Sequence, residues 1–328
     1  MRRIQPLQSF DQIKLLADPR RMKILCLLMA EDATLTQLAR ALKHSPAWVR
    51  HHILALESAG LVQPAGVRVS GKVTEKYYRA AAGAFILQET ILPKSKKPAI
   101  LFSGSDDLSL NGIAVHLAKH VTLLNFPVGS LDGLVNLRQG LCQVSGSHLL
   151  DENGEYNTPF IRHLFPDRDI ELVTLAHRTQ GWMLAPGNPL QLRGIEDLTR
   201  DDVRFVNRNP GSGTRVWIDA QLRKAGIASE LIRGYDHEVT THNEAAALIR
   251  AGKADISLGL QAAASAHGLG FIPLFEERYD LALMREHERE ILPVLDYIQT
   301  EDFRRSLATL TGYNAAHSGE QIPLEEKP

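Results

Sequence analysis

The chain has 328 residues, with 37 Lys and Arg against 38 Asp and Glu and a formal net charge of −1. This length exceeds that of one typical domain and predicts two or three domains. The chain has two cysteines, Cys26 and Cys142, which lie too far apart in the sequence to indicate a disulfide framework or a cysteine metal site. No apolar run can serve as a signal peptide or approaches the roughly 20 residues of a membrane helix, so we expect a soluble cytoplasmic protein with no membrane partner.

The charge is distributed unevenly. Residues 1–98 contain 16 Lys and Arg and 7 Asp and Glu, a net charge of +9, which leaves −10 for the remainder. A basic N-terminal part on an acidic body predicts a polyanionic partner for the first part and a different task for the second.

The first 92 residues predict short helices followed by a hairpin. Apolar periodicity favours helices over 10–17, from Pro19 and from Thr34. Ser45 is then an N-cap and Pro46 the first residue of a longer helix. The order is helix, turn, helix.

The longer helix and the hairpin supply the candidate DNA contacts. Val49, Ile53 and Leu56 form its buried stripe, which leaves the N-terminal residues facing outward, as on a recognition helix in the major groove. Residues 61–69 and 73–79 alternate as strands of a basic wing. The predicted DNA-binding residues are Ser45, Pro46, Ala47, Trp48, Arg50 and His51 on the helix, and Arg68, Lys72 and Lys76 on the wing.

The segments "LADPRRMKILCLL", "TLTQLARAL", "SPAWVRHHILALESAGLV" and "GKVTEKYYRA" resemble the ArsR-type winged helix-turn-helix family. The resemblance implies double-stranded DNA as a partner and a homodimer built from the flanking helices, for which Phe10–Ala17 and Ala84–Leu92 are the candidates. ArsR-type metal sensors carry paired cysteines before the recognition helix, where this chain has "ATLTQLA". We therefore expect no metal site there.

The segment Pro93–Pro98 is basic and bracketed by prolines, so it predicts a short stiff linker. Beyond it, short apolar strands alternate with helices, which predicts an α/β domain with a mostly parallel sheet. Two strand pairs, at 171–185 and 270–284, flank an inner α/β part. The chain is therefore expected to cross from lobe one (99 to about 175, and 277–316) into lobe two (178–272) and back.

Four loops with small hydroxyl residues precede helices, and the loop Asn207–Arg215 is the richest of them. Free backbone N–H groups and the helix dipole at such sites attract anions, and arginines can add charge-assisted contacts. A tight, capped turn is the alternative for each loop. The candidate ligand-binding residues are Ser103, Ser105, Ser130, Arg208, Ser212, Gly213, Thr214, Arg215, Thr241 and His242.

The segments "SGSDDLSL", "GSLDGL", "GSHLLDENGEYN", "APGNP", "RFVNRNPGSGTR", "TTHNEAAALIRAGKADISLG" and "PLFEERYDLAL" resemble type II periplasmic-binding-protein domains, in particular the cytoplasmic version related to molybdate and tungstate binders. The resemblance implies a ligand held between the two lobes and makes molybdate or tungstate the first expectation. A small organic anion or a molybdenum-cofactor fragment is the alternative.

The loop with His148, Asp151, Glu152 and Tyr156 either lines the ligand site or forms a solvent-facing turn, and Asp106 and Asp107 are expected to cap the next helix. Motifs for a P-loop, a GxSxG elbow or an HExxH metal pair do not occur in the sequence. We expect no enzyme, no catalytic residue and no cofactor besides an effector anion.

The expected architecture is an α+β winged helix-turn-helix domain (1–92), the linker (93–98), an α/β two-lobed periplasmic-binding-protein-like (type II) domain (99–316) and a C-terminal tail (317–328). The expected function is a one-component, dimeric transcriptional regulator that senses a small anion. The alternative is a cytoplasmic anion-binding or delivery protein that uses the helix-turn-helix only to dimerise.

Overall fold

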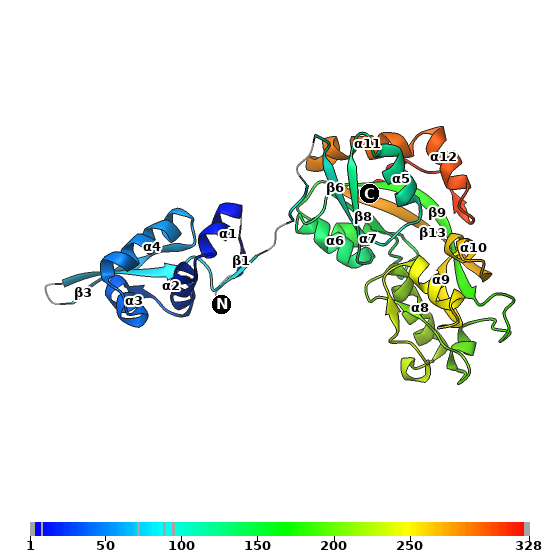
Figure 1. Cartoon of the computed structure of the whole chain (residues 1–328), viewed down its shortest axis with the longest axis horizontal. Coiled ribbons are helices and arrows are strands. Elements are labelled where there is room, and N and C mark those ends of the chain that lie inside the picture. The colour runs from blue at the N-terminus through cyan, green and yellow to red at the C-terminus, as the bar shows by residue number, and fades with distance from the viewer. Residues whose placement is uncertain (1–3, 8, 71–72, 88–89, 94–95, 325–328) are drawn as a thin grey trace. The chain divides into compact units, whose positions relative to one another are not determined.

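The computed structural model describes residues 4–7, 9–70, 73–87, 90–93 and 96–324 (Figure 1). The chain separates into two compact units, Met1–Thr90 and Ile91–Pro328. Among the described residues, no helix combines the length and the apolar character needed to cross a bilayer.

Unit one contains a helical core and a small antiparallel sheet. Its helices are α1 (Phe10–Leu16), α2 (Pro19–Ala30), α3 (Leu35–Leu42) and α4 (Pro46–Ser58). Its strands are β1 (Ile4–Pro6), β2 (Ala33–Thr34), β3 (Val62–Ser70), β4 (Val73–Ala80) and β5 (Ala84–Ile86). The sheet has the order β2-β4-β3. These elements are the predicted helix-turn-helix and hairpin.

Each helix of unit one begins where the sequence places a capping residue. The side chains of Ser9, Asp18, Thr34 and Ser45 accept hydrogen bonds from backbone N–H groups two or three residues ahead. The caps determine where the helices start, and the buried stripes of α2 and α4 then pack together. The core residues they share are Ile24, Leu25, Leu28, Val49, Ile53 and Leu56.

The expected flanking helix at 84–92 does not occur in residues 84–87 and 90–92, and residues 88 and 89 lie outside the described part of the chain. Residues Ala84–Ile86 form strand β5, which pairs in parallel with β1, and Phe85 packs on the core of unit one. The aromatic and branched side chains of Phe85 and Ile86 favour a strand here. The other flanking segment is helical, as expected, over α1.

Unit two is built on a seven-stranded mixed sheet with the order β12-β9-β13-β8-β6-β7, to which β14 adds beside β9. Its strands are β6 (Ala99–Gly104), β7 (Thr122–Pro127), β8 (Val144–Ser147), β9 (Ile170–Leu184), β12 (Ile256–Leu260), β13 (Gly270–Met284) and β14 (Tyr313–Asn314). A separate parallel pair is formed by β10 (Asn207–Arg208) and β11 (Glu238–Val239).

Helices cover this sheet in both lobes. They are α5 (Ser109–Leu117), α6 (Ser130–Arg138), α7 (Thr158–Leu164), α8 (Gly213–Ala225), α9 (His242–Arg250), α10 (Gln261–Ala266), α11 (Glu288–Ile298) and α12 (Glu301–Ala308). Short 3-10 helices are η1 (Ile195–Thr199), η2 (Ser229–Leu231) and η3 (Arg285–His287).

The expectation of a mostly parallel sheet is wrong. Strands β6, β7 and β8 are parallel to one another, but β9 and β13 run antiparallel to each other and to their other neighbours. The alternation of strands and helices holds inside each lobe. The chain passes from lobe one to lobe two along β9 and returns along β13, so these two strands run in opposite directions.

Strands β9 and β13 also correct the two expected strand pairs. Each is one continuous strand of 15 residues, and the two lie side by side from lobe one into lobe two (Figure 1). The sequence predicted two short apolar strands in each place. Instead Arg178 and Glu277 stand opposite each other in register and form a buried ion pair. Cross-strand pairing satisfies the charges, so the strands continue.

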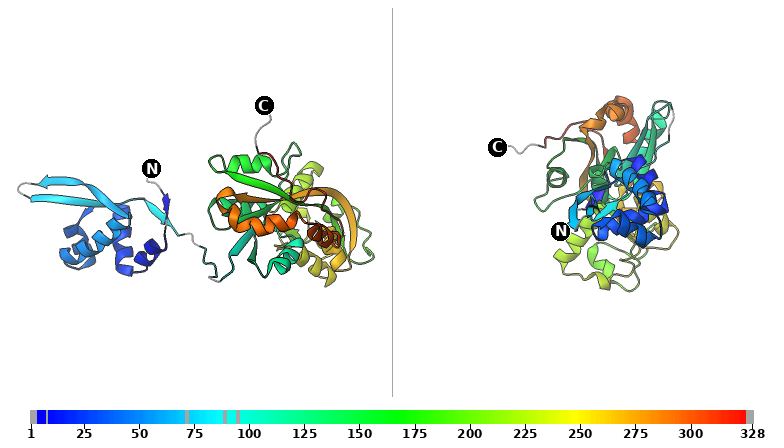
Figure 2. Two further views of the ribbon diagram at one scale, coloured as in Figure 1. Left: turned by 90° about the horizontal axis from the view of Figure 1, so that it is seen from above. Right: turned by 90° about the vertical axis from the view of Figure 1, so that its left-hand side faces the viewer.

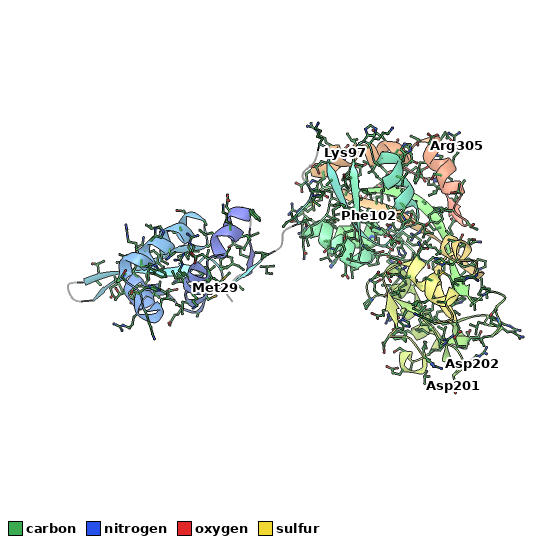
Figure 3. All side chains as sticks on the ribbon, viewed as in Figure 1. Met29, Lys97, Phe102, Asp201, Asp202 and Arg305 are labelled. Atoms are coloured by element: carbon green, nitrogen blue, oxygen red, sulfur yellow. The ribbon has the colours of Figure 1, made fainter. Side chains whose placement is uncertain are left out.

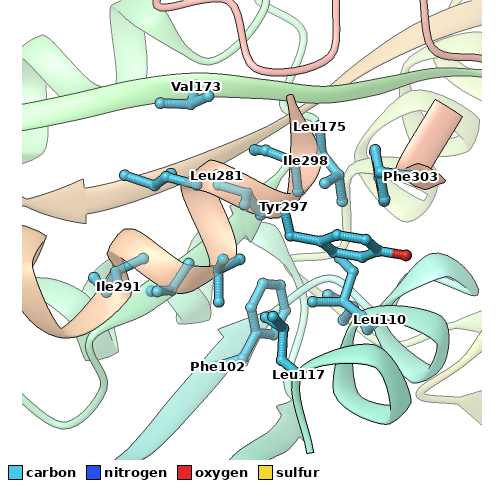
Figure 4. Close-up of a cluster of buried hydrophobic side chains, with 14 of the residues drawn as sticks. Phe102, Leu110, Leu117, Val173, Leu175, Leu281, Ile291, Tyr297, Ile298 and Phe303 are labelled. Carbon is cyan, nitrogen blue, oxygen red and sulfur yellow. The ribbon is translucent and has the colours of Figure 1, made fainter. Parts of the chain in front are cut away.

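Lobe one has an apolar core beneath α5, α11 and α12. Phe102, Leu110, Tyr297 and Phe303 meet there (Figure 4). In Figure 2 the orange and red helices α11 and α12 pack beside this lobe's sheet. Part of the expected tail packs on another apolar cluster of lobe one, where Ile322 and Leu324 contact the group that includes Leu172, and the backbone N–H of Ile322 donates to the carbonyl of Leu172 at 2.8 Å.

Lobe two has cores on both faces of its sheet. Trp182 and Phe205 pack against α8 on one side, and Met183 and Ala246 pack with α9 and α10 on the other. The labelled pair Asp201 and Asp202 lies at the end of lobe two away from lobe one (Figure 3). The opposite edge, where α8 and α9 begin, faces lobe one.

Candidate functional site

The predicted DNA-reading residues of α4 are presented outward. Ser45, Pro46, Ala47, Arg50 and His51 are exposed in unit one, while the stripe through Val49 is buried. The Oγ of Ser45 accepts from the backbone N–H of Trp48, the third residue of α4, at 3.2 Å, and this cap holds the first turn of the helix.

Trp48 is only half-buried and differs from its exposed neighbours. Its ring stacks on His44 at 3.8 Å between ring centroids and meets the edge of His52 at 4.3 Å. This aromatic packing fixes the turn between α3 and α4.

The wing carries the other predicted DNA contacts. Arg68 and Lys76 are exposed on β3 and β4, where Arg68 lies over the ring of Tyr77 and Lys76 over that of Tyr78. Lys72 lies outside the described residues. Contact of these side chains with DNA stays a prediction.

In unit two, the structure brings the predicted helix-start loops together around His148. The Oγ of Ser105 lies 2.9 Å from His148 Nε2, and the Oγ of Ser130 accepts from the His148 backbone N–H at 3.2 Å. An added Cβ on Gly213 would lie 2.6 Å from His148 Nδ1. Because Gly213 begins α8 in lobe two, His148 links both lobes.

Hydrogen bonds also join the two lobes directly. The N–H of Leu131 donates to the carbonyl of Gly211 at 3.1 Å, and the side-chain amide of Asn209 donates to the carbonyl of Val128 at 2.8 Å. The loop Asn207–Arg215 therefore rests on the start of α6 in lobe one.

Most of the predicted hydroxyls build these loops. Ser212 caps α8 and donates to the carbonyl of Asn209, Thr241 caps α9, and Ser103 accepts from Asn136. Thr214 accepts from Gln180 at 3.0 Å. These bonds hold the helix starts in place, with Ser103, Ser105, Ser130, Ser212 and Thr214 all buried.

The two predicted arginines have different surroundings. Arg215 forms ion pairs with Asp219 at 3.0 Å and with Glu238 at 2.9 Å, and its Nη1 also donates to the carbonyl of Arg208. The structure therefore engages Arg215 within lobe two and does not direct it to the other candidates.

Arg208 is 1% exposed and has no carboxylate partner among the described residues. Its Nη2 donates to the carbonyl of Thr240 at 2.7 Å, while Nε and Nη1 have no hydrogen-bond partner in the described part of the chain. Burial lowers the pKa of Arg208 to about 10. A buried cation with free N–H groups costs stability unless an anion binds it.

His242, the first residue of α9, is fully buried, and both of its ring nitrogens are without partners among the described residues. Burial and the nearby positive charge of Arg208 lower its pKa well below 6.5. The imidazole is therefore neutral and offers one donor and one acceptor.

A buried network on β9 and β13 completes the site. Arg178 pairs with Asp107 at 2.7 Å and with Glu277, and Glu277 Oε2 also lies 2.7 Å from His148 Nδ1. Burial by itself raises the pKa of Glu277, but Arg178 and His148 reverse this and hold it at about 2. The carboxylate is ionised and its charge is compensated.

Sequence reasoning missed Arg178, Gln180 and Glu277. The available signal was their position, because three polar side chains stand between or at the ends of the short apolar strands that the sequence predicted. The expected loop at 148–156 divides: His148 is buried in the site, whereas Asp151 accepts from the backbone of Asn153 in an exposed turn. Asp107 does accept from the backbone N–H of Ser109 at the start of α5.

The two neutral histidines make unit two sensitive to acid. Burial lowers the pKa of both His148 and His242 below 6.5, so the unfolded chain binds more protons than the folded one. The free energy of unfolding should therefore fall as the pH drops below about 6.5, with a limiting slope of about 1.4 kcal/mol per pH unit for each histidine that stays neutral in the folded state. Urea unfolding experiments between pH 5 and 7 measure this pH dependence of the free energy of unfolding.

The variant His242→Gln should remove about half of this slope of unfolding free energy against pH. The control is His120→Gln, which changes an exposed histidine and should keep the slope. An unchanged slope in His242→Gln would contradict the buried, neutral state of that imidazole.

Comparisons with known proteins agree with this architecture. Residues 18–63 match the family profile "Bacterial regulatory protein, arsR family", and residues 114–299 match "PBP superfamily domain". The protein YvgK of Bacillus subtilis (strain 168), described as uncharacterized, is 34% identical over 229 residues, which are 69% of this chain and 74% of YvgK.

Two solved structures are similar to unit two. One is a putative phosphate transporter substrate-binding protein of Clostridium perfringens with bound phosphate, at 14% identity and a TM-score of 0.46, covering 64% of this chain and 97% of that one. Another is the substrate-binding domain of a putative molybdenum transporter of Clostridium difficile, which is 14% identical with a TM-score of 0.43. The match covers 66% of this chain and 99% of that one. The similarity is one of fold.

Proposed function

This chain belongs to the PBP superfamily and joins such a domain to an ArsR-family helix-turn-helix, and we propose on this basis that it is a one-component transcriptional regulator in the cytoplasm. Unit one binds double-stranded DNA through α4 and the wing, and unit two binds a small anionic effector. The role is one of binding and not of catalysis.

The observation that carries the effector site is Arg208. Its guanidinium is buried at the edge of lobe two that faces lobe one, with Nε and Nη1 unpartnered among the described residues. The starts of α8 and α9 flank it and add the positive ends of two helix dipoles. An anion between the lobes would satisfy all of these groups.

Two classes of effector are considered. The family resemblance favours a tetrahedral oxyanion such as molybdate or tungstate. The alternative is a small organic anion or a molybdenum-cofactor fragment. Supporting the alternative, several of the hydroxyls expected to bind an oxyanion are already used in helix caps and loop contacts.

The signal would pass through closure of the lobes and a homodimer. Supporting dimerisation, unit one has an apolar groove of about 320 Å³, lined by residues of α1, α2 and β5, and Phe10 beside it is 59% exposed. For closure to act as a switch, the effector must prefer one state, and about 5.5 kcal/mol of differential affinity takes a 1:99 mixture to 99:1.

The test combines effector binding and DNA binding on the full chain. A thermal-shift panel uses molybdate, tungstate, sulfate, phosphate and small carboxylates and sulfonates, since a ligand of the folded state raises the melting temperature. Gel shifts then use DNA from the protein's own upstream region with and without the active anion. Anion binding with no DNA binding would instead indicate a delivery protein, and no binding of either would refute the proposal.

Closure itself can be tested at Gly213. An alanine Cβ there would lie 2.6 to 2.7 Å from atoms of His148, including its backbone oxygen, so the lobes cannot meet without strain. Overpacking of this kind costs about 1–3 kcal/mol, and Gly213→Ala should weaken binding of phosphate about tenfold, measured by calorimetry.

The matched control is Gly112→Ala in α5, where an added Cβ meets Ser306 Oγ at an ordinary 3.5 Å. Equal affinity of Gly213→Ala and wild type would show that the bound state does not need this contact.

A further inference from the structure

We propose that the effector carries a hydrogen-bond donor of its own, a hydroxyl, an N–H or a protonated oxygen, beside its anionic group. This inference rests on the proposed function and names the chemical class of the effector. It separates organic hydroxy or amino acids and protonated oxyanions from molybdate, tungstate and sulfate, which at neutral pH offer only acceptors.

The first observation is the side-chain oxygen of Gln180. Gln180 is fully buried, and its Oε1 has no hydrogen-bond partner among the described residues. Its Nε2 donates to Thr214 Oγ1 at 3.0 Å and to Glu277 Oε2 at 2.9 Å. Because the Glu277 carboxylate only accepts, the amide cannot be turned around, and Oε1 must be the unpaired atom.

The second observation is His242. It is buried beside Arg208, and neither Nδ1 nor Nε2 has a partner in the described part of the chain. A neutral imidazole needs one acceptor for its N–H and one donor for its other nitrogen. An anionic oxygen supplies the first, and only a ligand with a donor supplies the second.

These groups lie on one edge of lobe two. Gln180 is opposite Leu260 where β9 pairs with β12, and an added Cβ on the preceding Gly259 would be 3.1 Å from His242 Nδ1. The Nη2 of Arg208 donates to the carbonyl of Thr240, two residues before the start of α9, at 2.7 Å. Anion-binding N–H groups and unpaired acceptors are thus neighbours at the starts of α8 and α9.

The charges at this edge favour the same class of ligand. Arg178 is already paired with Asp107 and Glu277, so Arg208 is the buried arginine here whose charge lacks a carboxylate among the described residues. Its Nε and Nη1 have no partner among those residues, so Arg208 suits one anionic group with neutral polar contacts around it.

Calorimetry with the full chain at pH 7.5 tests the proposal with matched anions. The pairs are phosphate against sulfate and lactate against propionate, and molybdate and tungstate are added. A site that pairs with a donor rejects the analogue without it strongly, and we expect the donor-bearing member of each pair to bind at least about tenfold more tightly.

The variant Gln180→Met removes the unpaired acceptor and should bring the ratio within each pair towards one. The control is Gln143→Met, which makes the same change in lobe one, where Gln143 Oε1 accepts from the Leu101 backbone N–H, and it should keep the wild-type ratio. If Gln180→Met fails to fold, the wild-type ratios still decide.

Equal or tighter binding of sulfate, molybdate or tungstate by the wild type would overturn this inference and leave the proposed anion sensor standing. An unchanged ratio in a folded Gln180→Met would overturn the role of Gln180. If no anion in the set binds while DNA does, the proposed effector site fails together with the inference.

Discussion

Arg208→Met is expected to abolish binding of phosphate, with a loss of about 100-fold or more, while the ligand-free protein becomes more stable. The loss follows because the charge-assisted bonds of a buried guanidinium to an anion are strong, and cutting one partner from such a buried pair costs about 2–5 kcal/mol. The ligand-free protein becomes more stable because Arg208 is buried without a carboxylate partner among the described residues, so its charge carries a desolvation cost. A methionine of similar length has no charge and removes this cost.

Calorimetry measures the affinity, and thermal melts without and with phosphate measure both stabilities. The opposite signs of the two effects distinguish a ligand-binding arginine from one that supports the fold, for which both would decrease. The control is Arg204→Met, because Arg204 lies just before β10 and pairs with Asp255 at 2.8 Å. Retained phosphate binding by a folded Arg208→Met would remove the central support for the effector site.

The second large effect is expected at the DNA-reading helix. The double variant Arg50→Ala/His51→Ala should weaken binding to the upstream DNA about 100-fold, because each base or phosphate contact contributes roughly 1–3 kcal/mol. Both residues are exposed at the N-terminal end of α4 and take no part in the core of unit one, so the fold should remain intact. Fluorescence anisotropy with a labelled duplex measures the affinity.

The same titrations at several salt concentrations add a second readout. Removing a phosphate contact lowers the slope of log affinity against log salt by about one. The matched control is Lys119→Ala/His120→Ala, another exposed basic pair, located in lobe one. Wild-type affinity and slope in the Arg50/His51 variant would exclude the proposed docking of α4 in the major groove.

The two units place their functions on different kinds of structure. In unit one, the reading residues stand on a helix whose first turn is capped by Ser45 and braced by the stack of Trp48 on His44. In unit two, β9 and β13 join the two lobes, and the groups proposed to bind the effector, Arg208, His242 and Gln180, lie on one edge of lobe two.

Local signals in the sequence determined the helix-turn-helix, most of the order of strands and helices, and the approximate starts of α5, α6, α8 and α9. Caps such as Ser45, Thr34 and Ser212 act on N–H groups within three residues, so short stretches contain all the information required. The apolar stripe of α4 is equally local, and Val49, Ile53 and Leu56 are buried as expected.

Only the tertiary structure decided which polar residues are satisfied. Arg208 and Arg215 belong to one loop and look alike in sequence, yet Arg215 meets Asp219 and Glu238 while the Nε and Nη1 of Arg208 have no partner in the described part of the chain. Likewise Arg178 and Glu277 lie 99 residues apart and pair because two long strands align them. Ion pairs and desolvation depend on distance in space, which periodicity and caps along the chain do not specify.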